Sequence, residues 1–261
     1  MRDLAIVISN KNKNMTPFET INAVKEAGFE NVFIQWYNKN WEISQEKQLE
    51  YIKKQNLNVV FAHLGYQYIN DIWEDTDAGD KLVDSYINDL NICKENNISM
   101  VIMHLASKLT PKPFNEKGLN RIRKIVEYAE KLNIKVALEN TKQVDYLEKV
   151  LENIKNENAG LCYDSGHCHA FSDDNFNYEK FKNRIFAVHL HDNDKSDDLH
   201  LLPFDGTIDW DFVVEKLKEC NYTGPITIET TYRNDYLKST PVDFYKDAYY
   251  AAKKISEIFE K

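Results

Sequence analysis

The sequence predicts an α/β protein that folds as a single (β/α)8 barrel, and two observations lead to this fold class. Eight short apolar runs alternate with eight longer amphipathic segments from one end of the chain to the other. Alternation at this spacing is typical of βαβ units and of a parallel sheet. The length of 261 residues is close to a common size for one such barrel. We therefore expect one domain over residues 1–261.

The apolar runs give the expected strands, and the segments with helical periodicity give the expected helices. The strands are expected at Leu4–Ser9, Val32–Trp36, Val59–Leu64, Met100–Leu105, Val136–Asn140, Gly160–Asp164, Phe186–His191 and Ile226–Thr230. The helices are expected at Pro17–Ala27, Ser44–Gln55, Asp77–Asn96, Glu116–Leu132, Val144–Ile154, Asn175–Lys182, Asp209–Cys220 and Val242–Phe259. The chain has neither a GxGxxG segment nor a P-loop, which favours a closed barrel over an open doubly wound sheet.

Local signals agree with these boundaries. Between Leu119 and Leu132, apolar side chains recur every three or four residues, which places one stripe of that helix against the sheet. Asp209 stands before the apolar run of the seventh helix and can cap its N-terminus. Gly28 follows the first helix at an expected break.

Composition indicates an ordinary soluble globular protein of the cytoplasm, with 43% hydrophobic and 29% charged residues. The cysteines form no CxxC pair, so we expect reduced thiols, and we interpret Cys162 and Cys168 as packing residues. The N-terminal segment lacks the pattern of a signal peptide, and no stretch reaches the roughly 18 apolar residues of a membrane span. The expected protein therefore has no membrane partner.

The net charge of −9 gives no support for electrostatic binding of nucleic acid over a large surface. A local basic patch would still suffice for binding, so a nucleic acid partner is disfavoured but left open. The sequence also leaves open the formation of a homo-oligomer.

Side chains of the metal-binding type stand at or beside the carboxyl end of strand after strand. They follow buried-looking runs such as VVFAHL, KVALEN and ITIET, where a carboxylate or imidazole is costly to bury without a partner. The strand ends of a closed parallel barrel converge at one face, so these side chains become one site, which a divalent metal explains best. The nine residues are His63, His104, Glu139, Asp164, His167, His189, Asp198, His200 and Glu229.

The acidic residues support both metal binding and catalysis. Glu139 and Glu229 would bind one metal from opposite walls of the barrel mouth and also act in acid–base chemistry, because a metal tunes their proton affinity. A structural salt bridge is the alternative for each. Asp164 closes a strand, and the Ser-Gly turn after it lets His167 reach the same cavity. His169 is interpreted as a non-ligand.

The remaining histidines admit more than one role. His189 and His191 are two residues apart and share a face of a strand. His191 can bind substrate, replace His189 as a ligand, or hydrogen-bond to Asp192. His63 and His104 end neighbouring strands. A single histidine there would be a core residue whose ring is hydrogen-bonded within the protein, but two together indicate a site.

A mixed set of oxygen and nitrogen ligands without thiolate suits a transition metal. We expect Zn²⁺ or Mn²⁺, with Co²⁺ or Mg²⁺ as alternatives. One ion is the minimum, and the extra histidines permit two or three. Asp198 and His200 form a D-x-H pair in the polar loop of residues 192–204, and this pair is either part of the site or simply solvated.

Aromatic and cationic residues beside strand ends are candidates for substrate contacts. Trp36 and Tyr66 can form an apolar wall, although aromatic residues mostly build core. Lys108, Lys142 and Arg233 lie just past strand ends. They can bind a phosphate or sugar hydroxyls, or they are ordinary surface residues.

The sequence resembles the xylose-isomerase-like, metal-dependent TIM-barrel superfamily over nearly the whole chain. This superfamily includes sugar and sugar phosphate isomerases and epimerases, and also the endonuclease IV type of apurinic/apyrimidinic endonuclease. The resemblance rests on five motifs, specific in their order and spacing: ALENT (137–141), GLCYDSGHCHAF (160–171), VHLHDND (188–194), DLHLLPFDGTIDW (198–210) and TIET (227–230).

The resemblance to the sugar enzymes implies a metal held by Glu139, Asp164, His189 and Glu229. The two glutamates would remove and return a proton at the carbon beside a carbonyl, while the metal stabilises a cis-enediolate. His167 would lie near a substrate oxygen. The implied partner is a small-molecule sugar or sugar phosphate.

The resemblance to endonuclease IV implies three zinc ions, with ligand types that also match His63, His104, His167, Asp198 and His200. Against this, KQVDY follows ALENT where a glycine-rich segment is expected, and DGTIDW is more similar to the sugar branch. A sugar isomerase or epimerase is therefore the first hypothesis, and a phosphodiester-cleaving enzyme is the second. A non-catalytic metal-binding barrel is the third.

Overall fold

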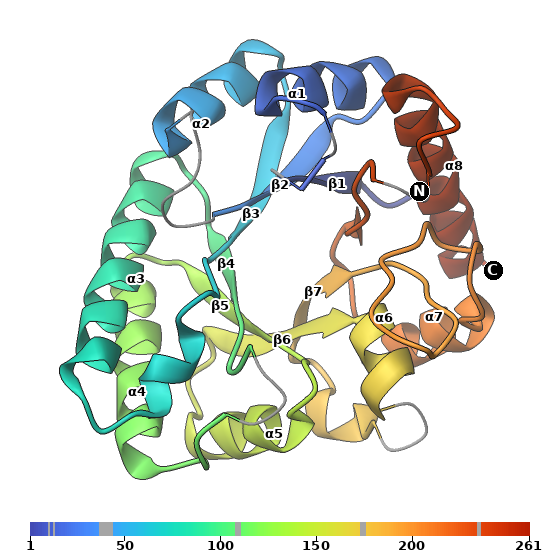
Figure 1. The fold of residues 1–261 in the computed structure, drawn as a ribbon. Helices are drawn as coiled ribbons and strands as arrows, with labels where there is room; N and C mark the ends of the chain where they lie inside the picture. Colours follow the sequence, from blue (N-terminus) through green and yellow to red (C-terminus); the bar gives the residue numbers. More distant parts are fainter. Residues whose placement is uncertain (10, 13, 37–43, 108–110, 173–175, 234–235) are drawn as a thin grey trace.

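Eight parallel strands and the helices between them form a (β/α)8 barrel in the computed structural model (Figure 1). The strands pair in the order β7-β6-β5-β4-β3-β2-β1-β8, and the fold class predicted from the sequence is confirmed. The structure describes residues 1–261 except 10, 13, 37–43, 108–110, 173–175 and 234–235.

Most elements lie within a few residues of their expected bounds. The strands are β1 (Leu4–Ile8), β2 (Asn31–Gln35), β3 (Asn58–His63), β4 (Met100–Met103), β5 (Lys135–Glu139), β6 (Ala159–Asp164), β7 (Ile185–His189) and β8 (Ile226–Ile228). The α-helices are α1 (Pro17–Glu26), α2 (Gln45–Lys54), α3 (Asp77–Glu95), α4 (Glu116–Lys131), α5 (Val144–Asn153), α6 (Ser165–His167), α7 (Trp210–Glu219) and α8 (Pro241–Phe259). A 3₁₀ helix spans Ile69–Trp73, and a π-helical turn, Cys168–Ser172, continues α6.

The sheet closes between its first and last members, β7 and β8. Leu190 N–H donates to Thr227 O at 2.9 Å, and Glu229 N–H donates to Leu190 O at 3.0 Å. Closure places β1 and β5 on opposite sides of the barrel, because four strand positions separate them in either direction around the ring (Figure 1).

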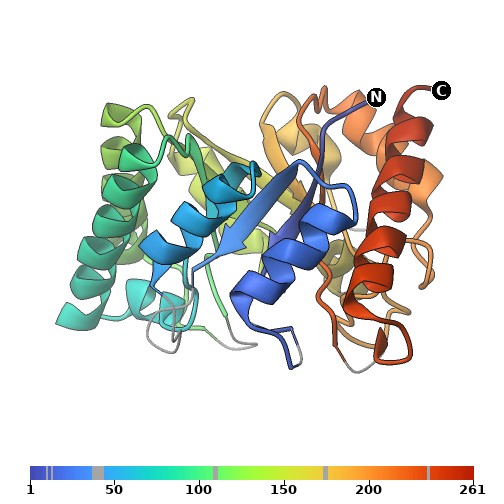
Figure 2. The ribbon, with the colours of Figure 1, turned by 90° about the horizontal axis from the view of Figure 1, so that it is seen from above.

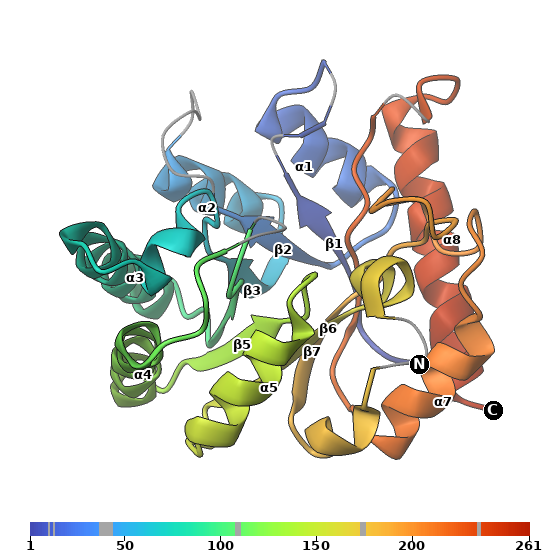
Figure 3. The same cartoon turned by 60° about the horizontal axis from the view of Figure 1, so that its bottom comes forward.

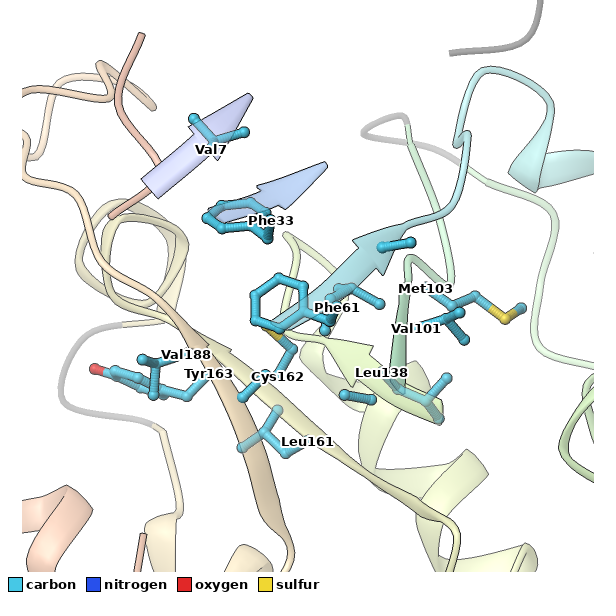
Figure 4. Close-up of a cluster of buried hydrophobic side chains, with 14 of the residues drawn as sticks. Val7, Phe33, Phe61, Val101, Met103, Leu138, Leu161, Cys162, Tyr163 and Val188 are labelled. Carbon is cyan, nitrogen blue, oxygen red and sulfur yellow. The ribbon is translucent and has the colours of Figure 1, made fainter. Parts of the chain in front are cut away.

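The interior of the barrel is filled with apolar side chains. Phe33 of β2 and Phe61 of β3 pack with ring centroids 4.7 Å apart, and Figure 4 shows them beside each other within the strands. Both are completely buried, as are Val101 and Leu138. Burial of this many apolar groups is the main stabilising contribution to such a core, and it gives the strand ends a rigid base.

The long helices form a ring around the strands, and the two chain termini lie side by side at one end of the barrel (Figures 1 and 2). The Met1 amino group is 3.5 Å from the Glu260 carboxylate. The short helix α6 lies inside this ring, beside β6 and β7 (Figure 3). Among the described helices, none combines the length and the hydropathy that crossing a bilayer requires.

The prediction of a helix over Asn175–Lys182 is wrong. Its first residue lies outside the described residues, and the remainder contains only a 3₁₀ helix, Tyr178–Phe181. The helical segment after β6 instead begins at once, because the Asp164 carboxylate accepts a hydrogen bond of 2.7 Å from His167 N–H and caps the new helix. The expected cap of α7 is confirmed, since Asp209 accepts a hydrogen bond from Phe212 N–H at 3.1 Å.

Candidate metal centre

A cavity of about 520 Å³ opens at the carboxyl ends of the strands, a size suited to a small-molecule ligand. Seven of the nine predicted ligand residues line it, and the other two, Asp164 and His189, are fully buried beside it. The structure therefore brings together residues from six strand ends and one loop. The seven lining residues are His63, His104, Glu139, His167, Asp198, His200 and Glu229.

The central ligand group consists of Glu139, Asp164, His189 and Glu229. One potential ligand atom from each lies within 4.8 Å of the others. His189 Nδ1 is 3.3 Å from Glu139 Oε2 and 3.4 Å from Glu229 Oε2. The His189 ring stacks on Phe33 with centroids 5.0 Å apart, so the barrel core holds this imidazole between the two carboxylates.

A second ligand group lies at the ends of β3, β4 and β5. His63 Nε2 is 3.2 Å from His104 Nε2, and each nitrogen is 3.1 Å from Glu139 Oε2. His63 Nδ1 donates to Leu64 O at 2.8 Å, which directs the lone pair of Nε2 toward Glu139 when the ring is neutral. Tyr66 stacks on His104 with centroids 4.5 Å apart.

A third ligand group lies in the loop after β7. Asp198 Oδ2 is 3.1 Å from His200 Nε2 and 3.4 Å from His167 Nε2. His200 Nδ1 donates to the backbone oxygen of Glu229 at 2.8 Å, which turns Nε2 toward the Asp198 carboxylate. The Asp198 and His200 pair therefore lies at the cavity rather than in a solvated loop.

The donor set of the three groups fits a divalent cation. Among the described residues, neither ring nitrogen of the buried His189 makes a hydrogen bond. His63 and His104 both point a nitrogen at the same oxygen of Glu139, and a cation would satisfy these converging lone pairs. Ligating histidines usually donate their other N–H to a carbonyl or carboxylate, as His63 and His200 do here.

The crowding of charges in the cavity changes proton affinities. Burial alone would lower the pKa of His167, but neighbouring carboxylates, above all Asp164, outweigh burial and raise this pKa well above its usual value. Burial would raise the pKa of Glu139, but His104 and His189 outweigh burial and hold this pKa well below its usual value. Glu139 is therefore ionised at neutral pH, which is the form that binds a metal.

The structure adds three residues that sequence reasoning missed. Gln35, at the end of β2, donates to Glu229 Oε1 at 2.6 Å. Asn140 donates to the backbone oxygen of Asp164 at 2.9 Å and accepts from its N–H at 2.7 Å. Lys11 lines the cavity. Gln35 could have been identified from the sequence, because a polar residue ends an apolar run there. Lys11 could not, because it follows its strand in a lysine-rich segment where no single lysine stands out.

Two predicted substrate-contact residues, Trp36 and His191, do not line the cavity. Trp36 is only 2% exposed and is not among the lining residues. His191 is fully buried, with Nε2 3.0 Å from Asp164 Oδ1. Cys162 lies close to the central ligand group, but burial raises its pKa to about 12, which keeps the thiol protonated and a weak ligand. Lys108 lies outside the described residues.

The fold and the strand-end residues define a member of a large group of (β/α)8 barrels. The chain belongs to the xylose isomerase-like TIM barrel family, whose model matches residues 21–253. The resemblance inferred from the motifs is thereby confirmed.

Two curated relatives share part of the sequence. "Uncharacterized protein MJ1311" of Methanocaldococcus jannaschii is 33% identical over 138 residues, which are 49% of this chain and 47% of that protein. "Uncharacterized protein y4fM" of Sinorhizobium fredii is 29% identical over 146 residues, which are 56% of this chain and 46% of that protein. The matched stretch is thus a little under half the length of either relative.

Solved structures of sugar epimerases share the whole fold. A D-tagatose 3-epimerase-like protein has a TM-score of 0.77 at 20% identity, covering 100% of this chain and 97% of its own. An L-ribulose 3-epimerase has a TM-score of 0.78 at 15% identity, with the same coverage of 100% and 97%. IolI, described with a bound zinc atom, has a TM-score of 0.72 at 17% identity and covers 100% of both chains. At these identities the likeness establishes the fold alone.

Proposed function

We propose that this protein is a divalent-metal-dependent isomerase or epimerase of a sugar or sugar phosphate. The main support is that the carboxylates of Glu139 and Glu229 both lie within 3.4 Å of His189 Nδ1 at one cavity. Two acid–base groups from the ends of separate strands, β5 and β8, can reach different sides of one bound carbon chain. The sugar 3-epimerases of similar fold support the same class of reaction.

In the proposed reaction, one glutamate accepts the proton from the carbon beside the substrate carbonyl, and the other donates a proton to the resulting enediolate. The hydrogen bond from Gln35 to Glu229 Oε1 orients this carboxylate, so that Oε2 faces His189. Phe33 and Phe61 pack beneath His189 and exclude water from that side. A divalent ion in the central ligand group would supply positive charge that stabilises the developing negative charge on substrate oxygens.

The test is exchange of substrate C–H hydrogen with solvent. Protein loaded with Zn²⁺ or Mn²⁺ is incubated in D₂O with ketoses, aldoses and their phosphate esters, and NMR detects deuterium at the carbon beside the carbonyl. Wild type should exchange at least one sugar. Glu139→Gln and Glu229→Gln should each slow exchange by about 100-fold or more, because a general base is lost. Glu127→Gln, on the exposed side of α4, is the matched control and should retain the wild-type rate.

Phosphodiester cleavage is a second candidate, favoured by the arrangement of the ligand residues in three adjacent groups. Glu139 belongs to both the central and the second group. Neighbouring metal ions are well suited to stabilising the attacking and leaving oxygens of such a displacement. The loaded protein should therefore also be incubated with abasic duplex DNA. Nicking without any sugar exchange would replace the first proposal, and metal binding with neither activity would indicate a non-catalytic barrel.

A further inference from the structure

We propose that the substrate of this cavity carries a phosphate ester and that Lys142 binds its phosphate group. This inference rests on the proposed sugar isomerase or epimerase function and narrows its substrate class. Lys142 and Lys11 both line the cavity. Lys11 follows β1 and Lys142 follows β5, and these strands lie on opposite sides of the closed ring. An elongated substrate lying over the central ligand group would therefore end at one of the two lysines.

Neighbouring side chains of the cavity already neutralise the positive charge of Lys11. Its Nζ donates to the hydroxyl oxygen of Tyr66 at 3.0 Å. The carboxylates of Glu229 and Asp198 also attract this ammonium group electrostatically. Lys11 therefore offsets part of the negative charge of the candidate metal centre and is poorly placed to attract a further anion.

Lys142 has a different environment. Its Nζ lies 4.1 Å from the centre of the Phe171 ring, a cation–π contact that holds the charge at the cavity wall. Across the described part of the chain, no carboxylate lies within ion-pair distance of this ammonium group. A positive charge at the cavity, held by an aromatic ring and without an acidic partner among the described residues, is suited to receive an anionic group.

The neighbouring wall offers further donors to a phosphate. Thr141 and Ser107 line the same cavity, and each hydroxyl can donate one hydrogen bond. Three donor groups match the three terminal oxygens of a phosphate monoester better than the two oxygens of a carboxylate.

The negative charge of the cavity is a further reason to expect a cationic side chain at the phosphate position. Glu139, Asp197, Asp198 and Glu229 line the cavity, and the whole chain has a net charge of −9. A neutral sugar can accept a hydrogen bond from Lys142 but gains nothing from its charge. An anionic substrate would be repelled by these carboxylates unless positive charge at the wall acted together with the bound metal.

The test compares sugars with their own phosphate esters in equilibrium binding to the metal-loaded full chain. The pairs are D-fructose with D-fructose 6-phosphate and D-ribulose with D-ribulose 5-phosphate, and D-gluconate is the carboxylate probe. Wild type should bind at least one ester about tenfold or more tightly than its parent sugar, as expected for a charge-assisted hydrogen bond. Lys142→Met should remove most of this preference, weakening the ester about tenfold more than the sugar.

Lys135→Met is the matched control. Lys135 begins the same strand, β5, and its Nζ lies 4.7 Å from the Phe186 ring centre, so the variant removes an equivalent charge and ring contact at the other end of the barrel. It should leave every affinity unchanged.

Three results would overturn the proposal. One is that no ester binds more tightly than its parent sugar. Another is that Lys142→Met weakens ester and sugar equally. The third is that D-gluconate, rather than an ester, shows the Lys142-dependent preference. Because these affinities require no turnover, the preference can hold even if the Glu139 and Glu229 variants exchange hydrogen like wild type, so the two proposals fail separately.

Discussion

The carboxylate of Asp192 accepts a hydrogen bond of 2.9 Å from the indole N–H of Trp210. It also accepts hydrogen bonds of 3.0 Å from the backbone N–H groups of two residues in the intervening loop. Asp192 is completely buried and ties the beginning of this loop to its end. Since the loop contains Asp198 and His200, Asp192 orients the third ligand group from a distance.

Asp192→Asn should loosen this loop. The amide keeps one accepting oxygen and replaces the other with a donor, so at least one buried N–H loses its acceptor, which costs about 1–3 kcal/mol. We expect a lower free energy of unfolding in denaturant titrations and weaker retention of metal in elemental analysis. Asp194→Asn is the control, because the Asp194 carboxylate is exposed and accepts hydrogen bonds from Ser196, two residues further on, rather than from the end of the loop. A variant at 192 that matches wild type in both measurements would contradict this role.

Much of the fold and of the candidate site was predictable from the sequence, because strand ends of a closed barrel must converge. Six of the nine ligand-type residues were identified from apolar runs that ended in an acid or a histidine, and His167, Asp198 and His200 from the turn and the loop that follow such runs. The short helix α6 was missed because the Asp164 cap, rather than helical periodicity, starts it. The sequence left the role of His191 open between a substrate contact, a ligand and a hydrogen bond to Asp192. In the structure its Nε2 lies 3.0 Å from Asp164 Oδ1, and the ring lies with Asp198 and His200 in a group of possible metal ligands.

Metal binding should depend on His189 and not on His169. His189→Asn removes an imidazole from the central ligand group, whereas His169→Asn removes one whose Nε2 bonds to Thr207 Oγ1 at 2.9 Å. Loss of even a residue that supports a ligand weakens metal affinity by about 10–100-fold, so His189→Asn should weaken Zn²⁺ binding at least tenfold. Competition with a chromogenic chelator measures this affinity. Equal affinities in the two variants would argue against the central ligand group.

Gln35 should act as a positioning residue for Glu229. Gln35→Leu removes the 2.6 Å hydrogen bond to Glu229 Oε1, so the carboxylate should rotate more freely. We expect slower C–H exchange, by about tenfold. Gln48→Leu is the control, because Gln48 is a buried glutamine of α2 that does not line the cavity. If Gln35→Leu exchanged hydrogen at the wild-type rate, Gln35 would not orient the base.

Asp89 should make the stability of the protein depend on pH. This residue of α3 is 4% exposed, and its Oδ2 has no hydrogen-bond partner among the described residues. Burial raises the pKa of this carboxyl to about 7, whereas an unfolded aspartate titrates near 3.9. Between roughly pH 4 and pH 7 the folded state therefore holds more protons than the unfolded state, and the free energy of unfolding falls as pH rises through that window.

Asp89→Asn should remove this dependence. Denaturant titrations at pH 5, 6, 7 and 8 should show wild type losing about 2.7 kcal/mol, at about 1.4 kcal/mol per pH unit up to pH 7. The variant should lose less and should be the more stable protein at pH 8. Asp84→Asn, at an exposed position of the same helix, should follow the wild-type slope, because its carboxyl is already solvated in the folded state. All three proteins share the same site residues, so parallel curves for wild type and Asp89→Asn would mean that Asp89 is not protonated in the fold.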